Sequence, residues 1–548
     1  MRDRSLFLSL GLAIGMGAAC FNPETSDCTA GQAGCECAPD NTCEAGLECL
    51  DGLCSGDAET SGDGDGDTSG DGDGDSGDGD GDSGDGDGDG ADNQAPVIDS
   101  FLINDSDAPP LVEQAGPIVI AVEASDDSSV AELRIEVDGQ PYLTLPGPGP
   151  FLGEYVIGGE GFNGAYDFSV IAVDDEGLET SAGPISVGVS VTGGQLIETW
   201  TYDSGGSDRS CGIWVDRDGT ELIITGDTEV GGQFQSRIDR LIGPDWSKQI
   251  DASSSSIMDI VRLQNGEYLA VGAAGEQTML YRYDDEGVQI DTQAYDWTPP
   301  QVGPERWETP RQLHVDAEGS VYLLGDWDNQ QPAPNPFYLV KFTPELEVEW
   351  QRWGDDANLA AESHAVKMDL NAEEIALAGL SGSAWMARFD TEGNFIEELT
   401  LMNHDLSNGR DVALDDDGGR LLVGYVRSDE DLYFRTLMQH SGSLNWEQVG
   451  THDFSGYTLA AEYDDFGDSV VMSIEACAGS WRACSLFIRK FDVGGALLWE
   501  YQAPDNKFAL SAPFEGDLAT DRFGYVYATT LYESINGDWD RWAIKLHP

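Results

Sequence analysis

The chain has 548 residues, a formal net charge of −75 and a pI near 4.1, because 102 Asp and Glu residues outnumber 27 Lys and Arg residues. Nucleic-acid binding is excluded, since it requires a cationic surface that displaces counterions from phosphate. Peripheral adsorption to anionic lipid is equally unfavourable, so a covalent anchor is the expected route to a membrane.

The N-terminus has the pattern of a secretory signal, with two early arginines followed by an apolar run from Leu6 to Ala19 that is too short to span a bilayer. Residues 17–20 read Gly-Ala-Ala-Cys, which resembles the lipobox of bacterial lipoproteins. That resemblance implies lipidation of Cys20 and a signal peptide over residues 1–19. Gly17 departs from the aliphatic residue usual there, and a plain signal peptide cleaved nearby is the alternative.

A Cys-rich segment occupies residues 20–54. An even set of cysteines at short spacings in an exported chain predicts three disulfides, with their connectivity open. The six cysteines of this block are Cys28, Cys35, Cys37, Cys43, Cys49 and Cys54. Metal binding is the rival interpretation, although no His residues accompany the block.

Two of the remaining cysteines lie six residues apart in sequence, on a predicted hairpin. Cys477 and Cys484 are expected to form a cross-strand disulfide. This assignment leaves Cys211 as a buried thiol outside any disulfide.

Residues 55–94 contain Gly, Asp, Ser and Thr but no Lys or Arg, which predicts a disordered, solvated linker. Its alternate Asp residues favour diffuse, weak Ca²⁺ binding, since a specific site needs six to eight oxygens in a closed loop. The Cys block followed by a Gly-Asp linker resembles surface lipoproteins of myxobacteria. That resemblance covers roughly the first hundred residues and implies a lipid-anchored protein at the outer membrane or cell surface.

Residues 95–191 are predicted to form a separate β-sandwich. Apolar and polar residues alternate along Ile118–Ala124, Ala131–Gly139 and Ala165–Asp174, as they do in half-buried strands. The segment resembles bacterial Ig-like domains, which implies a spacer role. Calcium binding through its acidic turns is the alternative, with candidate ligands Asp126, Asp127, Asp174 and Asp175.

From residue 196 to 548 a β-rich unit recurs seven times, with an Asp- or Asn-Gly turn before its second strand. Asp316–Gly319 and Asp521–Gly524 are two copies of this turn, in which Asp binds its own backbone and Gly provides a positive φ. A β unit of roughly fifty residues is typical of a propeller blade. The repeats resemble bacterial β-propeller families of secreted proteins, without the boxes of sialidase or WD40 blades.

The two ends of this region predict how the ring closes. The last copy ends after its third strand, Trp542–His547, while Ile197–Tyr202 precedes the first copy. Donation of this N-terminal strand to the last blade would leave no open sheet edge. The sequence therefore predicts an all-β protein, with an Ig-like sandwich followed by a seven-bladed β-propeller closed by its N-terminal strand.

All 14 Trp residues lie in the propeller region, and those on strands, such as Trp200, Trp350, Trp446 and Trp499, are expected to wedge between sheets. Five others are candidate ligand-binding residues, because they lie in or next to the long loops that join strand four to strand one and strand two to strand three. Aromatic rings with neighbouring amides suit a glycan, whereas the alternative is that each Trp fixes its own loop. These five are Trp297, Trp307, Trp327, Trp481 and Trp539.

No motif for catalysis, metal binding or phosphate binding is present, and the six His residues are scattered. We therefore expect a monomeric, non-enzymatic envelope protein, lipid-anchored, whose propeller binds glycans or protein partners, with no cofactor beyond weak Ca²⁺. A propeller hydrolase or lyase acting on polysaccharide is the alternative, which a tight carboxylate cluster at the channel mouth would favour. A scaffold role in an envelope assembly would require a broad apolar patch.

Overall fold

The computed structural model describes residues 48–50, 53–55 and 94–548, the last range with gaps. Those gaps are 231–232, 244–245, 251–254, 275–276, 298–306, 329–336, 355–363, 381–383, 401–406, 416–417, 428–431, 441–442, 450–456, 476–483, 505–507, 509–515 and 534–538. The chain divides into two units, Met1–Asp89 and Gly90–Pro548. The described part of the first unit is a hairpin of β1 (Glu48–Leu50) and β2 (Leu53–Ser55), whose register places Cys49 opposite Cys54.

The N-terminal part of the second unit consists of two antiparallel sheets that share one apolar core. The three-stranded sheet has the order β3–β4–β7 and the four-stranded sheet the order β6–β5–β8–β9. A short 3-10 helix, η1 (Glu160–Phe162), precedes β8. The strands are β3 (Val97–Ile103), β4 (Gly116–Ser125), β5 (Val130–Val137), β6 (Gln140–Pro146), β7 (Phe151–Ile157), β8 (Gly164–Asp174) and β9 (Glu179–Val189).

The alternation in the sequence explains this pair of sheets. Along β5, Leu133, Ile135 and Val137 are buried while the residues between them are partly exposed, so one face of the strand packs on the core. Phe168 and Val170 on β8 contribute to the same core. The three strands predicted for this region coincide with β4, β5 and β8, apart from differences of one or two residues at their ends.

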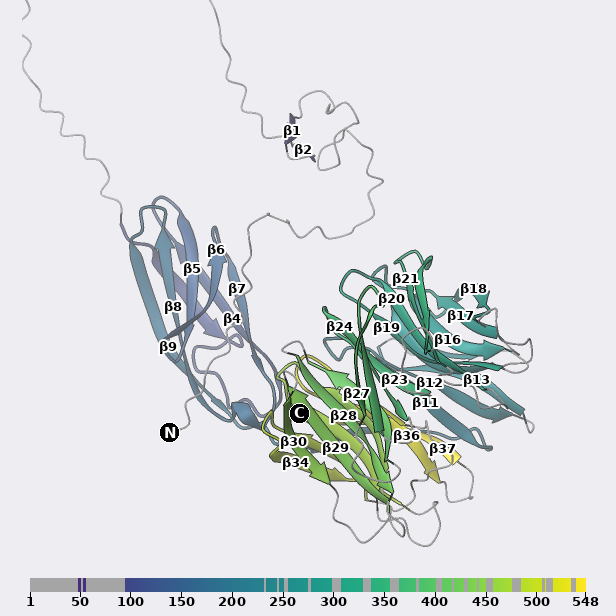
Figure 1. The fold of residues 1–548 in the computed structure, drawn as a ribbon. Helices are drawn as coiled ribbons and strands as arrows, with labels where there is room; N and C mark the ends of the chain where they lie inside the picture. Colours follow the sequence, from purple (N-terminus) through teal and green to yellow (C-terminus); the bar gives the residue numbers. More distant parts are fainter. Residues whose placement is uncertain are drawn as a thin grey trace, which may run out of the picture. The chain divides into compact units, whose positions relative to one another are not determined.

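Seven four-stranded antiparallel sheets follow, so the all-β prediction is confirmed. Six of them take their four strands in chain order (Figure 1). Their strands are β11 (Asp208–Val215), β12 (Leu222–Val230), β13 (Gln233–Ile242) and β14 (Trp246–Ile250); β15 (Ser255–Arg262), β16 (Tyr268–Ala274), β17 (Gln277–Tyr283) and β18 (Gln289–Tyr295); β19 (Trp307–Val315), β20 (Val321–Asp328), β21 (Phe337–Phe342) and β22 (Val348–Trp353); β23 (His364–Leu370), β24 (Glu374–Leu380), β25 (Ala384–Asp390) and β26 (Phe395–Thr400); β27 (Ser407–Leu414), β28 (Gly419–Arg427), β29 (Leu432–His440) and β30 (Ser443–Val449); β31 (Tyr457–Tyr463), β32 (Ser469–Glu475), β33 (Ser485–Phe491) and β34 (Leu497–Gln502).

The seventh sheet combines the two ends of this region. Its order is β10 (Leu196–Tyr202), β37 (Trp539–Leu546), β36 (Val526–Glu533) and β35 (Gly516–Thr520). The register between β10 and β37 runs from Leu196↔Leu546 to Tyr202↔Arg541. The strand expected to be donated by the N-terminal side of the repeats therefore does pair with the last third strand.

The first strands of the seven sheets contact one another in a closed cycle, in the order β11, β15, β19, β23, β27, β31, β35 and back to β11. This cycle is the pattern of a propeller-like fold, in which the first strands surround the axis. The second and third strands of a sheet are covered on both faces by the neighbouring sheets. In β32 and in β33, for example, all seven residues are buried. Outer strands such as β18 alternate between exposed and half-buried residues.

The turns between first and second strands use one recurring arrangement. In the turn that starts at Asp316, the Asp316 carboxylate accepts hydrogen bonds from the backbone N–H groups of Glu318 and Ser320. Gly319, at φ +85°, donates its backbone N–H to the Asp316 carbonyl. The turn that starts at Asp521 repeats this arrangement, so one local device shapes turns in different sheets.

Candidate functional site

A cavity of about 390 Å³ lies where the first strands surround the axis, and residues from all seven of these strands line it. Its lining carries five carboxyl groups, one histidine and one tryptophan. Each of these seven groups lies on the first strand of a different sheet. These residues are Trp214, Asp259, His314, Asp369, Asp411, Glu462 and Asp517.

A common backbone irregularity lies at or just before these side chains in most of the first strands. In six of the seven first strands the register with the second strand shifts at the same place, as between Ile257 and Asp259 and between Gly409 and Asp411. A β-bulge leaves a residue outside the ladder and redirects the side chains that follow it. The same position, four residues before each first turn, lies at this shift in six strands and at Asp517 in β35, where the register is regular. We call these seven positions the cavity layer: Gly212, Asp259, Gln312, Lys367, Asp411, Ala460 and Asp517.

Side chains of the cavity layer join each sheet to the next. Asp259 Oδ2 accepts a hydrogen bond from the backbone N of Leu313, one sheet further, at 2.8 Å. Gln312 Oε1 accepts from Met368 N at 2.7 Å, and Asp411 Oδ2 accepts from Ala461 N at 2.9 Å, each again on the following sheet.

These bonds satisfy backbone donors that would otherwise lie unpaired near the axis. Part of the carboxylate chemistry of this layer is therefore structural.

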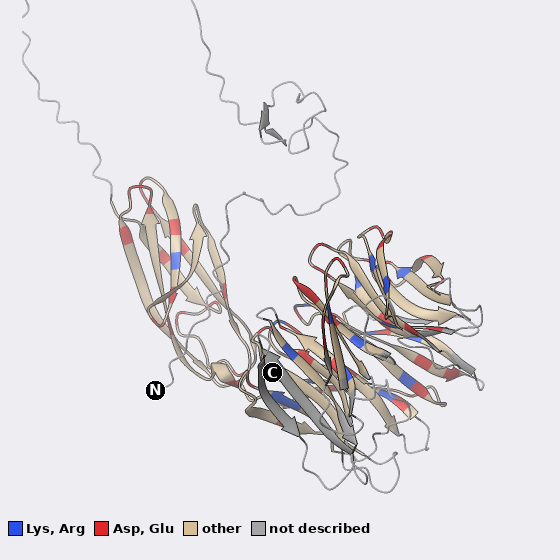
Figure 2. Cartoon of the chain, in the orientation of Figure 1, with Lys and Arg blue, Asp and Glu red and all other residues tan. Residues whose placement is uncertain are grey.

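Lys367 supplies the positive charge of the cavity layer. Its Nζ lies 2.8 Å from Asp517 Oδ1, and both side chains are largely buried. Burial alone lowers the pKa of Lys367, but Asp517, Asp411 and Asp259 raise it above its usual value overall. Figure 2 shows Lys and Arg positions scattered among the acidic ones over these sheets. Lys490, beside Asp464 and Asp468, is a second buried ammonium group among carboxylates.

Two carboxyl groups of this layer bind protons unusually tightly. Burial, followed by the charge of Asp517, raises the pKa of Asp259 to about 7. Burial also raises the pKa of Asp411 to about 7, although Lys367 opposes that shift. Desolvation, followed by the charge of Asp369, raises the pKa of the half-buried Glu462 well above its usual value.

The histidine of the cavity is neutral at physiological pH. Burial and the charge of Lys367 lower the pKa of His314 to about 4. His314 Nδ1 lies 3.7 Å from Asp369 Oδ1, a separation too long for a strong hydrogen bond, so this contact does not outweigh burial. With one nitrogen near Gln312, the imidazole can accept or donate a hydrogen bond without carrying charge.

The cavity thus offers proton-holding carboxyls, a neutral imidazole and the guanidinium of Arg262, with the Lys367 ammonium group beside the lining residue Asp517. When ionised, the five carboxyls outnumber the two positive charges of Lys367 and of Arg262, which also lines the cavity, so the interior favours cations. Trp214 adds an aromatic surface to the lining, and aromatic faces attract cations when they are accessible.

The predicted Trp residues lie elsewhere. Trp297 is 6% exposed, stacks on Tyr295 with ring centroids 4.9 Å apart, and packs in the core that includes Phe342. Its placement fits the role of fixing its own loop, since a sugar could not reach its ring faces. Trp539 is half-buried at the start of β37.

For the other three Trp residues, less is described. Trp307 is the first residue of β19, and Trp327 is the second-last residue of β20. The register pairs Trp307 with Asp328, the residue after Trp327. Trp481 lies outside the described residues. The described positions do not bring the five Trp residues together as one platform.

The predicted cysteine sites are described only in part. Cys484 is buried and disulfide-bonded, while Cys477, its expected partner, lies outside the described residues. Cys211 on β11 is half-buried, which corrects the expectation of a buried thiol. Also outside the described residues are Cys20, Cys28, Cys35, Cys37 and Cys43.

The four acidic candidates for calcium in the sandwich mainly hold turns. Asp126 Oδ2 accepts hydrogen bonds from the backbone and hydroxyl groups of Ser128, and that hydroxyl also contacts Asp175. Asp174 Oδ1 accepts from the backbone N of Glu176 and of Leu178. Among the described residues, the carboxylates that approach one another closely enough to share an ion lie on the propeller-like region instead.

The repeat that is visible in the sequence lies in the second strands and their turns, away from the cavity. The signal lies four residues before each turn, where Lys367 and Asp411 interrupt apolar first strands. Charged residues are common throughout this acidic chain, so these positions become distinctive only when the first strands are placed around one axis.

No family model matches this sequence, and no curated protein matches it. Among solved structures, the chain is similar to a streptogramin B lyase (11% identity, 63% of this chain and 97% of that one, TM-score 0.40). It is also similar to the Pan2 WD40 domain of Neurospora crassa (10% identity, 64% and 94%, TM-score 0.41) and to YCF48 bound to D1 peptide (11% identity, 64% and 94%, TM-score 0.39).

Because these TM-scores lie below 0.5, the evidence for a propeller-like fold is the strand pairing of this chain itself. In the part of the chain that the structure describes, no helix has the length and apolarity needed to cross a membrane.

Proposed function

We propose that this chain is an exported, lipid-anchored protein whose seven-bladed β-propeller binds a small organic cation in its central cavity. The seven sheets, the closed cycle of first strands and the pairing of β10 with β37 support a seven-bladed ring closed by its N-terminal strand. The two sheets formed by β3–β9 support an Ig-like spacer in front of it.

The export and anchor part of the proposal rests on the N-terminal sequence. The apolar run before Cys20, the Cys block and the acidic linker favour lipidation followed by a flexible tether. The register of β1 and β2 supports Cys49–Cys54 as one of three disulfides. Mass spectrometry of the membrane fraction should find a diacylglycerol adduct on Cys20 that Cys20→Ser lacks, and an unmodified N-terminus in the wild type would contradict the anchor.

The observation that carries the binding proposal is the excess of buried carboxyls in a cavity of about 390 Å³. That volume lies at the small end of the range for ligand pockets, which suits a compact molecule. A cation would reduce the repulsion among Asp259, Asp411 and Asp517, and Trp214 offers an aromatic contact for its apolar part.

Protons and the ligand should compete for the same carboxyls. Because the pKa values of Asp259 and Asp411 are about 7, these groups are largely protonated at pH 6 and largely ionised at pH 8. A cation that requires one of them ionised should bind about tenfold more tightly at pH 8 than at pH 6.

Calorimetric titration of the full chain with putrescine, with 1,4-butanediol as its uncharged analogue, tests the proposal. Putrescine should bind saturably and more tightly at pH 8, whereas the diol should not bind. Asp411→Asn should weaken binding about 10- to 100-fold, as expected for the loss of a charge-assisted contact.

Glu286→Gln removes the same charge from an exposed turn and should leave the affinity unchanged. Equal affinity of putrescine for all three proteins, or no saturable binding, would contradict a cavity site.

The raised pKa values of Asp259 and Asp411 also favour a second candidate, a polysaccharide hydrolase or lyase. A carboxyl that keeps its proton near pH 7 can serve as a general acid. Release of reducing or unsaturated ends from a panel of acidic and neutral polysaccharides, abolished in Asp411→Asn and retained in Glu286→Gln, would favour this candidate over simple binding.

A further inference from the structure

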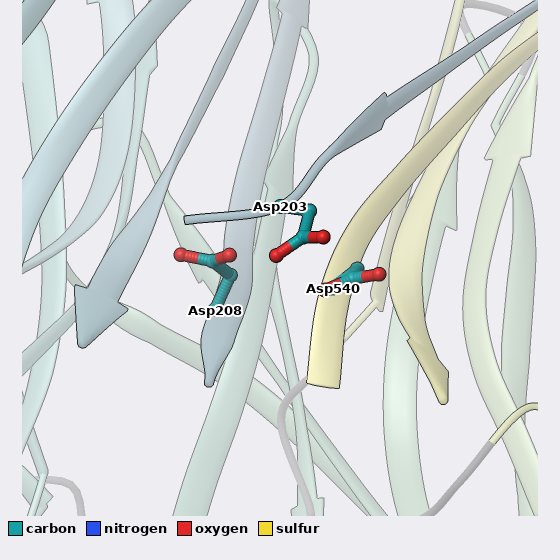
Figure 3. Close-up of side chains that lie close together, drawn as sticks. All are labelled: Asp203, Asp208 and Asp540. Atoms are coloured by element: carbon teal, nitrogen blue, oxygen red, sulfur yellow. The ribbon is translucent and has the colours of Figure 1, made fainter. Parts of the chain in front are cut away.

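Three aspartates converge at the seam where the first and last of the seven sheets meet. Asp203 directly follows β10, Asp208 begins β11, and Asp540 is the second residue of β37. One carboxylate oxygen from each lies within 4.8 Å of the other two. Figure 3 shows the Asp203 and Asp208 carboxylates directed toward one another, with Asp540 on the other side of Asp203.

The strand register makes this proximity unavoidable for two of the three. The last pair between β10 and β37 is Tyr202↔Arg541, so continuing the register by one residue places Asp203 opposite Asp540. Like charges directly opposite each other on neighbouring strands are destabilising. Asp540 is 7% exposed, so water screens its carboxylate poorly.

Asp208 provides an independent indication of a ligand. Its side chain is 0% exposed, and its Oδ2 accepts a hydrogen bond from the backbone N of Ser204 at 2.9 Å. Its Oδ1 is buried and has no hydrogen-bond partner among the described residues. A buried carboxylate oxygen without a partner is costly, and a bound cation would satisfy it.

We propose that Asp203, Asp208 and Asp540 bind a calcium ion that clamps the closing strand. Ca²⁺ takes six to eight oxygen ligands at about 2.3–2.6 Å, so oxygens up to about 5 Å apart can share one ion. The three carboxylates supply part of this shell, and Asp203, which is exposed, leaves room for water to complete it. Three carboxylates without His or Cys suit a hard cation rather than zinc.

An ion at this position would hold the closing strand β10 in place. It would connect β10 with the third strand of its own sheet and with the first strand of the next sheet. The proposal does not depend on ligand binding in the central cavity. A ligand that binds only the closed ring stabilises it by mass action, about 100-fold in the folding equilibrium at 100 times the dissociation constant.

The test compares the chelator-treated full chain with Asp208→Asn, and with Glu286→Gln as the charge-matched control. CaCl₂ should raise the melting temperature of the wild type and of Glu286→Gln saturably, and should slow amide exchange in residues 196–202. Asp208→Asn should lose both effects. Without calcium, Asp208→Asn should melt at or above the wild-type temperature, because the substitution relieves repulsion while Asn retains an acceptor for Ser204 N–H.

Tb³⁺ luminescence provides a spectroscopic measurement, because Trp539 and Tyr202 are the sequence neighbours of two ligands and can sensitise a bound lanthanide. One saturable class of emission, displaced by Ca²⁺ more readily than by Mg²⁺, is expected in the wild type.

Should Asp208→Asn fail to fold, the exposed Asp203→Asn replaces it, with weaker Ca²⁺ stabilisation expected. Equal calcium responses of the wild type and the Asn variant, as weak binding by the linker alone would produce, would overturn the proposal.

Discussion

The turns between first and second strands and the cavity layer both recur around the same ring, but different things are repeated in the two regions. In the turns, Asp316 and Asp521 make the same backbone hydrogen bonds with the same Gly conformation. In the cavity layer the backbone position recurs while its side chains include Asp, Gln and Lys. Repetition of side chains thus serves local folding, whereas variation at a repeated backbone position creates a chemically specific interior.

The largest expected effect tests whether Lys367 alone balances the negative charge of the cavity layer. Lys367→Met should lower the free energy of unfolding by about 3–5 kcal/mol, because it leaves Asp517 and its neighbours as uncompensated buried charges. Chemical denaturation at pH 7 measures this change. Lys341→Met, which removes an ion pair with the half-exposed Glu349, should cost only about 0–1 kcal/mol. Equal costs for the two variants would mean that Lys367 stabilises the fold no more than an exposed ion pair does.

The next largest effect is a pH dependence of the unfolding free energy that arises from the cavity residue Asp411. The folded-state pKa of Asp411 is about 7, above its ordinary value of 3.8, so the stability contributed by its proton is fully present below about pH 4 and is lost as pH rises through 7. Asp411→Asn cannot lose that proton. Between pH 4 and pH 8 the variant should therefore gain about 2–4 kcal/mol relative to the wild type.

Urea denaturation across this pH range checks that difference. Glu286→Gln should give a curve parallel to that of the wild type. A curve for Asp411→Asn that also runs parallel would show that its carboxyl titrates as an exposed one does.

At the turn end of the sheets the pH dependence should have the opposite sign. Burial alone raises the pKa of Glu374, but hydrogen bonds from Arg420 and Arg388 lower it overall. The stability from this ionised group is present above its ordinary pKa and is lost as pH falls. Glu374→Gln should cost about 1.5–3 kcal/mol at pH 7, and this cost should shrink as pH falls below the ordinary pKa of Glu, as measured by thermal unfolding. A cost that stays constant as pH falls would indicate lost packing instead.

The smallest effect is expected in a single turn. Asp390 accepts hydrogen bonds from the backbone N of Glu392 and of Asn394 in a turn whose Gly393 has φ +77°. Asp390→Ala should lower the unfolding free energy by about 1 kcal/mol, whereas Asp390→Asn, which keeps an acceptor, should cost less. Neither variant should change putrescine binding, and a change would show that turns and cavity are coupled.

Much of the fold could be predicted from the sequence because its determinants are local. Alternating and continuous apolar runs, with Asp and Gly at fixed places in the turns, predict strands and reversals wherever they occur. The extra strand at Ile197–Tyr202 was predicted to pair with the last repeat, and β10 does pair with β37. The alternation in residues 95–191 likewise matched observed strands.

The candidate sites could not be predicted in the same way. Trp297 occupies a long loop, as candidate ligand-binding residues often do, yet its ring is buried by Tyr295 and Phe342. Asp259, Lys367 and Asp411 are distant in sequence and have no shared motif. Their proximity arises because successive sheets bring equivalent backbone positions to one axis.

The sequence by itself determined the all-β class, the recurring turns and the acidity that excludes nucleic acid, because each depends on composition or on neighbours along the chain. Only the tertiary structure decided which of the many carboxylates line one cavity beside Lys367, and which three meet at the seam between β10, β11 and β37. Electrostatic interactions depend on distance and burial in space, and ring closure sets both for residues at opposite ends of the repeats.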